Sequence, residues 1–303
     1  MKRGKPEISG MLFILPGLAL LGTLLGANGI VAGERRCPHD IQQLYIPAGT
    51  FHMGSTREER EFAYRLDKQV TRRYGWYEKE TRQEVRTGSY CIDRYPVTNT
   101  QYKNFVDETG HVQPYISPEA YQRQGFLAHP YQKVEEFLWK KGSFSSNQGN
   151  HPVVLVSNTD AESYCAWRGK RLRQRYRLPT EAEWEKATRG TEGRIFPWGN
   201  EWNPDYLNSG QRFQFTTPVN LFPTGRSLYG VYDLAGNVFE WTSTPWSGPA
   251  GEQRNKFVLK SCSWDDLPGT CRAAMRHGRP GKSRHILIGF RCASDAATRE
   301  NGG

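Results

Sequence analysis

The stretch RLPTEAEWEKATRG at residues 177–190 constrains the fold more than any other part of the 303-residue chain. Thr180 and Glu183 have the spacing of a capping box, in which each side chain accepts a hydrogen bond from the other residue's backbone N–H. Gly190 follows the last turn, where a left-handed residue usually ends a helix. The stretch therefore predicts a strand-like run followed by a short, firmly bounded helix, on which Trp184 is a core anchor.

Seven further sequence blocks stand out on either side of this stretch. They are IPAGTFHMGS (46–55), YCIDRYPVTNTQYKNF (90–105), HPVVLVSNTDAESYCAWRGKRL (151–172), FPWGN (196–200), YGVYDLAGNVFEWT (229–242), VLKSCSWDDLPGTCRAAMR (258–276) and GFRC (289–292). In order and spacing, the eight blocks resemble the formylglycine-generating-enzyme domain, also called the sulfatase-modifying-factor domain, over residues 44–293. The resemblance implies an α+β fold of the C-type-lectin-like kind, with two main helices, small twisted sheets and much irregular loop.

Two capped helices are predicted outside the opening stretch. The first is capped by Thr98 or Asn99 and ends at Gly110. The second is capped by Thr159 and ends at Gly169. Both follow short apolar runs, which predict strands or buried segments that lead into the helices.

The N-terminus has the pattern of an export signal. Lys2, Arg3 and Lys5 precede an almost unbroken apolar run at residues 8–32, with small residues near its end. The run is also just long enough to span a bilayer, so a cleaved signal and an uncleaved anchor both stay open. We expect a signal peptide or N-terminal anchor at 1–33, a linker at 34–43, the family domain at 44–293 and a disordered tail at 294–303. The domain is then periplasmic or secreted, and it meets a membrane only through the anchor.

The net charge of +10 raises the question of a nucleic-acid partner. The basic residues are interleaved with acids, as in TREEREFAYRLDKQVTRR at residues 56–73, and no helix-turn-helix, zinc-finger or RNA-binding signature accompanies them. The sequence therefore favours no nucleic-acid partner. Residues 56–86 predict a charge-rich surface insertion that contains a solvated helix.

The six cysteines are an even number, and export favours their complete oxidation. Sequence alone allows fifteen connectivities. The resemblance implies a disulfide between Cys165 and Cys292, which match a pair that is bridged in some relatives. A second bridge is then expected between Cys37 and Cys91. Two cysteines are left, Cys262 and Cys271.

The turn DLAGNVFEW at residues 233–241 has the composition of a calcium site. Calcium takes six or more oxygen ligands from carboxylates and backbone carbonyls. The resemblance implies that Asp233 and Glu240 bind calcium through their side chains, and Gly236 and Val238 through their carbonyls. A purely structural alternative is an Asx turn in which Glu240 pairs with a nearby arginine.

The resemblance also implies a second calcium site, which includes the side chain of Asn208 and the carbonyl of Ser209. Its remaining ligands fall where this chain is shortened, around residues 211–216. The expected cofactor is therefore structural calcium, with the first site the better supported of the two.

Residues 258–276 match the segment that carries copper in the oxidases of the family. There, two cysteines five residues apart bind copper(I) as thiolates, because soft sulfur ligands select that ion. Cys271 matches the second cysteine, but the first falls on Asp266, a hard ligand, so the sequence does not support copper. Cys262 lies nearby instead. Three interpretations stay open: a structural disulfide between Cys262 and Cys271, a redox-active or metal-binding thiol pair, and an unpaired Cys271.

The resemblance further implies a substrate groove along the C-terminal segment, in which Ser263, Trp264, Arg272 and Arg276 contact a peptide. Arginine suits this role because its fork binds carboxylates through two parallel hydrogen bonds. A solvated basic surface is the alternative for this segment. Arg291, inside GFRC, is expected to be structural.

Two functions follow from these patterns. The first is an exported oxidoreductase or maturation factor that acts on a side chain of an exported protein or peptide, with Cys271 and either Cys262 or Asp266 as catalytic residues. Formylglycine generation itself is not expected, since the first copper cysteine is missing. The second is a non-catalytic, lectin-like binding module that presents the C-terminal groove to a partner. Motifs of zinc proteases, Walker-type nucleotide-binding proteins, serine hydrolases and dinucleotide-binding enzymes are absent from the sequence.

Overall fold

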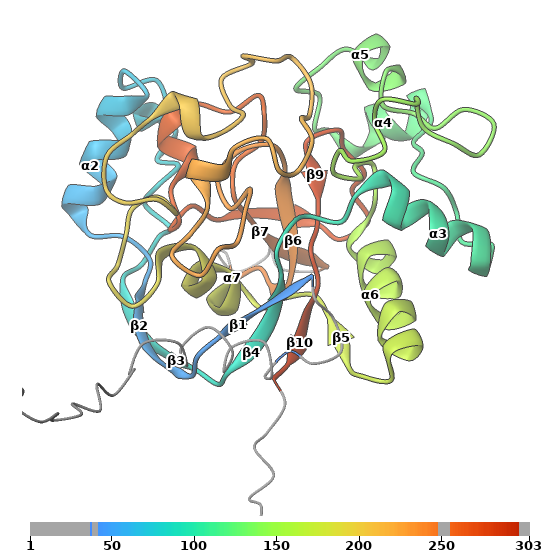
Figure 1. The fold of residues 1–303 in the computed structure, drawn as a ribbon. Coiled ribbons are helices and arrows are strands. Elements are labelled where there is room, and N and C mark those ends of the chain that lie inside the picture. Colours follow the sequence, from blue (N-terminus) through green and yellow to red (C-terminus); the bar gives the residue numbers. More distant parts are fainter. Residues whose placement is uncertain (1–36, 38–41, 248–254, 297–303) are drawn as a thin grey trace, which may run out of the picture.

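The computed structural model describes residue 37, residues 42–247 and residues 255–296 (Figure 1). The expected signal peptide or anchor, most of the linker and the end of the tail lie outside these residues. Strand β1 begins at Gln43 and strand β10 ends at Asp295, so the folded domain reaches slightly beyond residues 44–293 at both ends. No helix in the described part is long and apolar enough to cross a membrane.

One four-stranded antiparallel sheet joins the two ends of the domain. Its strands, in spatial order, are β1 (Gln43–Ile46), β4 (Tyr90–Asp93), β10 (Ala293–Asp295) and β5 (Tyr176–Arg177). Leu44 of β1 and Ala293 of β10 both pair with Ile92 of β4, on opposite sides of that strand. The register therefore fixes the first and last strands of the domain against one central strand.

Two further sheets are small. A two-stranded sheet contains β2 (Gly49–Met53) and β3 (Gln83–Thr87). A four-stranded sheet contains, in spatial order, β8 (His277–Pro280), β7 (Lys256–Lys260), β6 (Phe239–Pro245) and β9 (Ile288–Gly289). The pair β6–β9 is parallel, and the others are antiparallel. The last sheet leads directly into the cysteine-bearing loop after β7.

Six α-helices lie around these sheets in the described part of the chain (Figure 1). They are α2 (Arg57–Leu66), α3 (Asn99–Thr109), α4 (Pro118–Gln124), α5 (Tyr131–Glu135), α6 (Asn158–Leu172) and α7 (Glu181–Arg189). The two longest, α3 and α6, pack together through Tyr102 and Tyr164, whose rings stack at 5.8 Å. The mixed helix, sheet and loop content agrees with the expected α+β class.

Local capping explains where the main helices begin. In α7 the Thr180 hydroxyl accepts from the Glu183 N–H at 3.2 Å, and the Glu183 carboxylate accepts from the Thr180 N–H at 2.8 Å, which confirms the capping box. Helix α6 begins two residues earlier than expected, because Ser157 is its cap in place of Thr159. It also continues past Gly169 to Leu172.

Trp184 is the core anchor that its position in α7 predicts. It is fully buried in a cluster of apolar residues from the first sheet and the turn before β6. These neighbours include Ile46, Tyr90 and Leu234. The cluster packs α7 against the sheet that joins the two ends of the domain.

Two disulfides lie close to this sheet. Cys37 is bonded to Cys91 in β4, and Cys165 in α6 is bonded to Cys292, next to β10. Both are the expected pairs. The second tethers α6 to the end of the domain across 127 residues of sequence.

Candidate functional site

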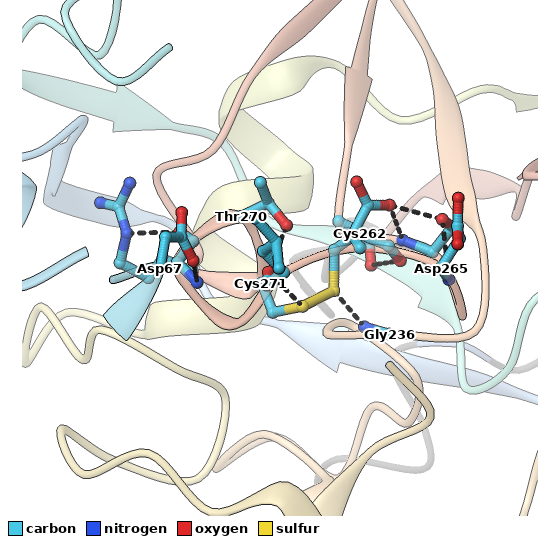
Figure 2. The surroundings of a disulfide bond; sticks show 12 residues. Asp67, Gly236, Cys262, Asp265, Thr270 and Cys271 are labelled. Atoms are coloured by element: carbon cyan, nitrogen blue, oxygen red, sulfur yellow. Dashed lines mark hydrogen bonds between the residues drawn. A yellow bond between two sulfur atoms is a disulfide. The ribbon is translucent and has the colours of Figure 1, made fainter. Parts of the chain in front are cut away.

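Cys262 and Cys271 form a disulfide with a Cα–Cα distance of 4.8 Å (Figure 2). Cys262 lies two residues after β7, and Cys271 is the last residue of the 3-10 helix η4 (Pro268–Cys271). Both side chains are fully buried, and the Gly236 N–H donates a hydrogen bond of 3.0 Å to Cys262 Sγ. A bridged sulfur is not a thiolate, so neither cysteine has the form that binds copper or attacks a substrate. Of the three interpretations open from the sequence, the structure has the disulfide.

Asp266, at the position of the missing copper cysteine, closes a turn inside the same loop. Its carboxylate accepts hydrogen bonds from the Ser263 N–H, at 2.8 Å, and from the Ser263 hydroxyl. Burial raises the pKa of Asp266 to about 6, although the two hydrogen bonds act in the opposite direction. Both hydrogen bonds are made by Oδ2 and come from Ser263, so Asp266 has a structural role in this loop.

The raised pKa of Asp266 predicts a pH dependence of stability. The folded state holds this proton more tightly than the unfolded state, whose aspartate pKa is about 4. The resulting contribution to the free energy of unfolding is full below pH ~4 and is lost as pH rises through ~6, by about 3 kcal/mol at most. The variant Asp266→Asn lacks this titration, so its stability relative to the native chain should rise across the window. Urea denaturation at several pH values measures the difference, and a difference independent of pH would contradict the prediction.

Residues 56–86 cover the disulfide loop, which corrects the expectation of a solvated surface insertion. Asp67, directly after α2, is buried and accepts hydrogen bonds from the Gly269 N–H, at 2.6 Å, and from the Tyr77 hydroxyl. Gly269 is packed so closely that an added Cβ would lie 2.6 Å from the carbonyl oxygen of Ala63. The insertion therefore closes the outer side of η4.

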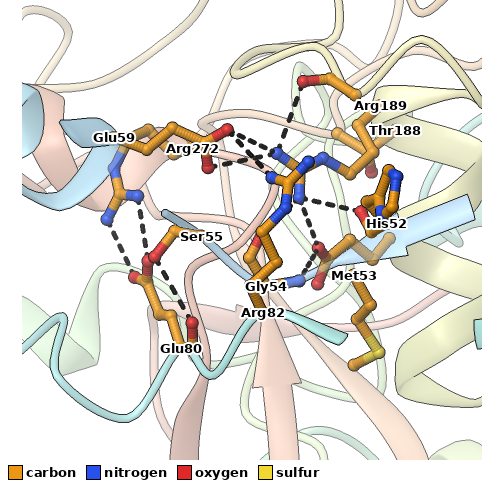
Figure 3. A network of polar contacts seen from close by, with 12 residues as sticks. His52, Met53, Gly54, Ser55, Glu59, Glu80, Arg82, Thr188, Arg189 and Arg272 are labelled. Carbon is orange, nitrogen blue, oxygen red and sulfur yellow. Dashed lines mark hydrogen bonds and ion pairs between the residues drawn. The ribbon is translucent and has the colours of Figure 1, made fainter. Parts of the chain in front are cut away.

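Arg272 forms a bidentate ion pair with Glu80, at 2.8 and 2.9 Å, and both side chains are buried (Figure 3). Close by, Glu185 accepts from Arg189 at 3.1 Å and from Lys260 at 2.8 Å. Buried charges are tolerated when they are paired and hydrogen-bonded, as these are. The network ties α7 and β7 to the insertion, and Arg272 lies in the interior in place of the expected substrate groove.

The other three residues expected to bind a substrate differ in their exposure to solvent. Ser263 and Trp264 are buried, and the Trp264 indole stacks on His129 with ring centroids 5.0 Å apart. Arg276 is partly exposed and binds Glu181 through two hydrogen bonds of 2.8 and 2.9 Å at the edge of a cleft of about 180 Å³. Of the four residues, Arg276 is the one that a ligand can reach.

Asp233 fits a bound cation, whereas Glu240 already has protein partners. Asp233 Oδ2 is buried and has no hydrogen-bond partner among the described residues, and burial raises the pKa of Asp233 to about 8. A cation beside that oxygen would stabilise its charged form. The Glu240 carboxylate is bound by Arg291, at 2.6 and 2.7 Å, and accepts from the Trp184 indole at 2.7 Å. Glu240 therefore forms the ion pair of the structural alternative, and Arg291 is structural as expected.

The second expected calcium site is centred on Asn208. Asn208 Nδ2 donates to the Phe215 carbonyl at 2.8 Å, and its Oδ1 is buried without a partner in the described structure. The carbonyl of Ser209 accepts from the Arg212 N–H. At the first expected site, the carbonyl of Gly236 accepts from the Val238 N–H. Across the residues that the structure describes, no three His, Cys, Asp or Glu side chains are grouped as metal ligands. Asn208 Oδ1 thus resembles Asp233 Oδ2 in lacking a partner, and neither expected calcium position has three grouped acidic ligands among the described residues.

A groove that the sequence did not signal lies beside the shortened segment. It encloses about 430 Å³ and is lined mainly by Asn147, Gln148, His151, Phe213, Phe215 and Leu221. Phe213 is 42% exposed and Leu221 is 46% exposed. Burial lowers the pKa of His151, so its ring is neutral beside the Thr216 hydroxyl at 3.0 Å. The lining of the groove combines apolar side chains with amide side chains.

Comparisons with known proteins agree with the fold. A family model described as the sulfatase-modifying factor enzyme 1-like domain matches residues 31–296. The inactive C-alpha-formylglycine-generating enzyme 2 of Mus musculus is 32% identical over 93% of this chain and 94% of its own length. The formylglycine-generating enzyme of Thermomonospora curvata is 32% identical over 86% of this chain and 96% of its own length.

Among solved structures, PvdO from Pseudomonas aeruginosa is similar, with a TM-score of 0.63 and 25% identity over 84% of this chain and 94% of PvdO. The family model spans the whole described domain, from β1 to β10. The cysteine-bearing loop, the turn around Asp233 and the capped helix α7 all lie inside the matched region. The chain therefore belongs to the sulfatase-modifying-factor family, the family of the formylglycine-generating enzymes.

Proposed function

We propose that the chain is an exported, non-catalytic member of its family that binds a protein or peptide partner. The observation that carries the proposal is the buried Cys262–Cys271 disulfide, together with a carboxylate at the position of the first copper cysteine. Copper(I) selects thiolates, and this loop offers none while the bridge is intact. Asp67 and the pair of Arg272 with Glu80 also close the loop from outside.

The groove at Phe213 and Leu221 is the surface that we assign to the partner. Its apolar lining residues, Phe213, Phe215 and Leu221, can bury hydrophobic side chains of a ligand. The amides of Asn147 and Gln148, which also line the groove, can both donate to and accept from a peptide backbone. An extended peptide segment therefore matches the groove better than a small charged metabolite does.

Copper chemistry is tested on the purified chain without thiol reductants. Copper(I) titration against a chelating dye should show no binding that depends on Cys271, and no oxygen should be consumed with a cysteine-containing peptide. The control is the double variant Cys262→Ser with Cys271→Ser, which leaves no unpaired thiol in this loop and should titrate like the native chain. Stoichiometric copper binding that these substitutions remove would overturn the proposal, because it would require free thiolates in the native protein.

Partner binding is tested on an array of random peptides. The double variant Phe213→Ser with Leu221→Ser should lose most of the peptide signals of the native chain, by about tenfold or more, since two exposed apolar contacts are removed. The control is Val112→Ser, which removes an exposed apolar side chain after α3. Equal signals for all three proteins would contradict the assignment of this groove.

We also propose that calcium binds at Asp233, as the family resemblance implies. Its support is the unpartnered Oδ2 and the raised pKa of this carboxyl. Calcium at ~100 times its Kd should then stabilise the fold by about 2–3 kcal/mol relative to a chelator. Asp233→Asn should lose this gain. Identical urea midpoints of the native chain with calcium and with chelator would contradict the prediction.

A further inference from the structure

Buried hydrogen bonds and an ion pair fix the loop between α2 and β3, residues 67–80, against the rest of the domain. Asp67 is buried and accepts from the Thr71 hydroxyl, at 2.8 Å, and from the Tyr77 hydroxyl. Glu80, at the other end, is locked by Arg272. A series of backbone hydrogen bonds, such as Val70 N–H to the Asp67 carbonyl at 3.0 Å, fixes the turns between them. The outer side chains are therefore presented by a preformed backbone.

The outer side of this loop carries large apolar side chains. Val70 is 50% exposed, Tyr74 is 56% exposed and Trp76 is 43% exposed. The rings of Tyr74 and Trp76 stack on each other with centroids 5.8 Å apart. Single exposed apolar residues need no explanation, but three within seven residues on one anchored loop indicate an interaction surface.

Cations surround these apolar side chains. Residues 65–79 contain five basic residues (Arg65, Lys68, Arg72, Arg73, Lys79) and two acidic ones (Asp67, Glu78), a net charge of +3. Arg72 is paired with Glu61, and Asp67 is buried. Arg65, Lys68 and Arg73 form no ion pair within the part of the chain that the structure describes. The surface is thus aromatic, aliphatic and positively charged.

We propose that residues 68–79 are a membrane-contact loop that binds a surface of anionic lipid. Tyrosine and tryptophan prefer the boundary between headgroups and acyl chains, because one end of each ring system is apolar and the other forms hydrogen bonds. Lys68 and Arg73 are placed to bind lipid phosphates, and anionic leaflets attract such residues. The charge of the loop complements that lipid and selects it over a neutral membrane.

A sugar ligand fits this surface less well. Stacking of a saccharide needs a free ring face, but Tyr74 already contacts Trp76 and lies under the Arg73 guanidinium at 4.6 Å. Val70 adds an aliphatic contact that a sugar hydroxyl does not match. The amide of Gln69, a polar group that could bind hydroxyls at this surface, accepts from Arg72 at 2.6 Å. Lipid is therefore the occupant that the loop favours.

The test uses the full chain added to phosphatidylcholine vesicles whose acyl chains are brominated, with or without phosphatidylglycerol. Bromine quenches tryptophan fluorescence at close range, and residues 1–33 contain no tryptophan, so the quenching reports the domain even if the N-terminus inserts. We expect quenching that requires phosphatidylglycerol, and Trp76→Phe should abolish most of it. Salt should weaken it, since the contact is electrostatic.

The charge requirement is tested by a matched pair of variants. Lys68→Glu with Arg73→Glu should reduce quenching at a given lipid concentration by about tenfold or more, because two cations near the surface are reversed. Lys140→Glu with Lys141→Glu carries the same change in net charge elsewhere and should behave like the native chain. Quenching that ignores Trp76 or phosphatidylglycerol, or equal loss in both double variants, would overturn the proposal. Retention on dextran sulfate that depends on Lys68 and Arg73, without any lipid quenching, would replace it with a soluble polyanion.

Discussion

Replacing Glu80 by alanine is expected to lower the free energy of unfolding by about 3–5 kcal/mol, because it leaves the buried guanidinium of Arg272 without its counterion. The side chains lie 2.8 and 2.9 Å apart and are shielded from water by the 56–86 insertion. Urea denaturation of the native chain and of Glu80→Ala measures the difference. Glu80 does not line the groove, so the loss should appear in stability and not in peptide binding.

Two control variants test whether the stability lost in Glu80→Ala comes from the unpaired buried charge. Asp107→Ala breaks the exposed pair of Lys103 with Asp107 in α3 and should cost less than about 1 kcal/mol. The double variant Glu80→Met with Arg272→Met removes both charges and should recover much of the stability lost in Glu80→Ala. A loss below about 1 kcal/mol in Glu80→Ala would mean that water or another group hydrates the Arg272 guanidinium, which would contradict its burial against the insertion.

Removing the Cys165–Cys292 disulfide by a double alanine substitution is expected to cost about 5 kcal/mol. The bridge spans 127 residues, and the entropy that a crosslink removes from the unfolded chain grows with the length of the closed loop. Removing Cys262–Cys271, whose separation is nine residues, should cost only about 3 kcal/mol by the same reasoning. Denaturation midpoints and slopes under non-reducing conditions measure both losses.

The order of these two losses is the informative result. A larger loss at Cys262–Cys271 would show that this short bridge does more than restrict the unfolded chain, for example by holding η4 in its buried position. Each double variant removes two sulfur atoms from buried positions, so the core packing lost is comparable in the two variants. The comparison therefore isolates loop length as the main variable.

The local chemistry of the sequence predicted some elements correctly. The capping box of α7 and the burial of Trp184 depend on neighbouring residues, and both are present. The start of α6 was misplaced because Ser157 and Thr159 are both good caps. Asp160 decides between them, since it accepts from the Ser157 N–H at 2.7 Å and completes a box with that residue.

Long-range pairing explains why the insertion was misjudged. Its acidic residues looked solvated because their partners are far away in sequence: Asp67 binds Gly269, and Glu80 binds Arg272. The pattern of charges along a segment predicts interactions between residues that are close in sequence. It does not predict contacts between residues about 190–200 positions apart. For the same reason the sequence placed Arg272 in a substrate groove, whereas the side chain lies in the protein interior.

The candidate site was only partly predictable for a related reason. The resemblance located the cysteine-bearing loop, but three states of Cys262 and Cys271 stayed open until their backbones were placed 4.8 Å apart. No sequence pattern predicted the groove at Phe213 and Leu221, because its residues come from irregular segments without helical or strand periodicity. For Glu240 the sequence offered an ion pair with an arginine as one possibility, and only the structure identifies that arginine as Arg291.

The redox state of Cys262 and Cys271 in the native protein tests the central claim most directly. Trypsin cleaves after Lys260 and Arg272, so both cysteines fall in one peptide, residues 261–272. The native protein is treated with an alkylating reagent without reductant, digested and analysed by mass spectrometry. A structural disulfide predicts this peptide without alkylation and two hydrogens lighter than its reduced form. An alkylated Cys271 in the native protein would contradict the disulfide and restore thiolate chemistry as the function of this loop.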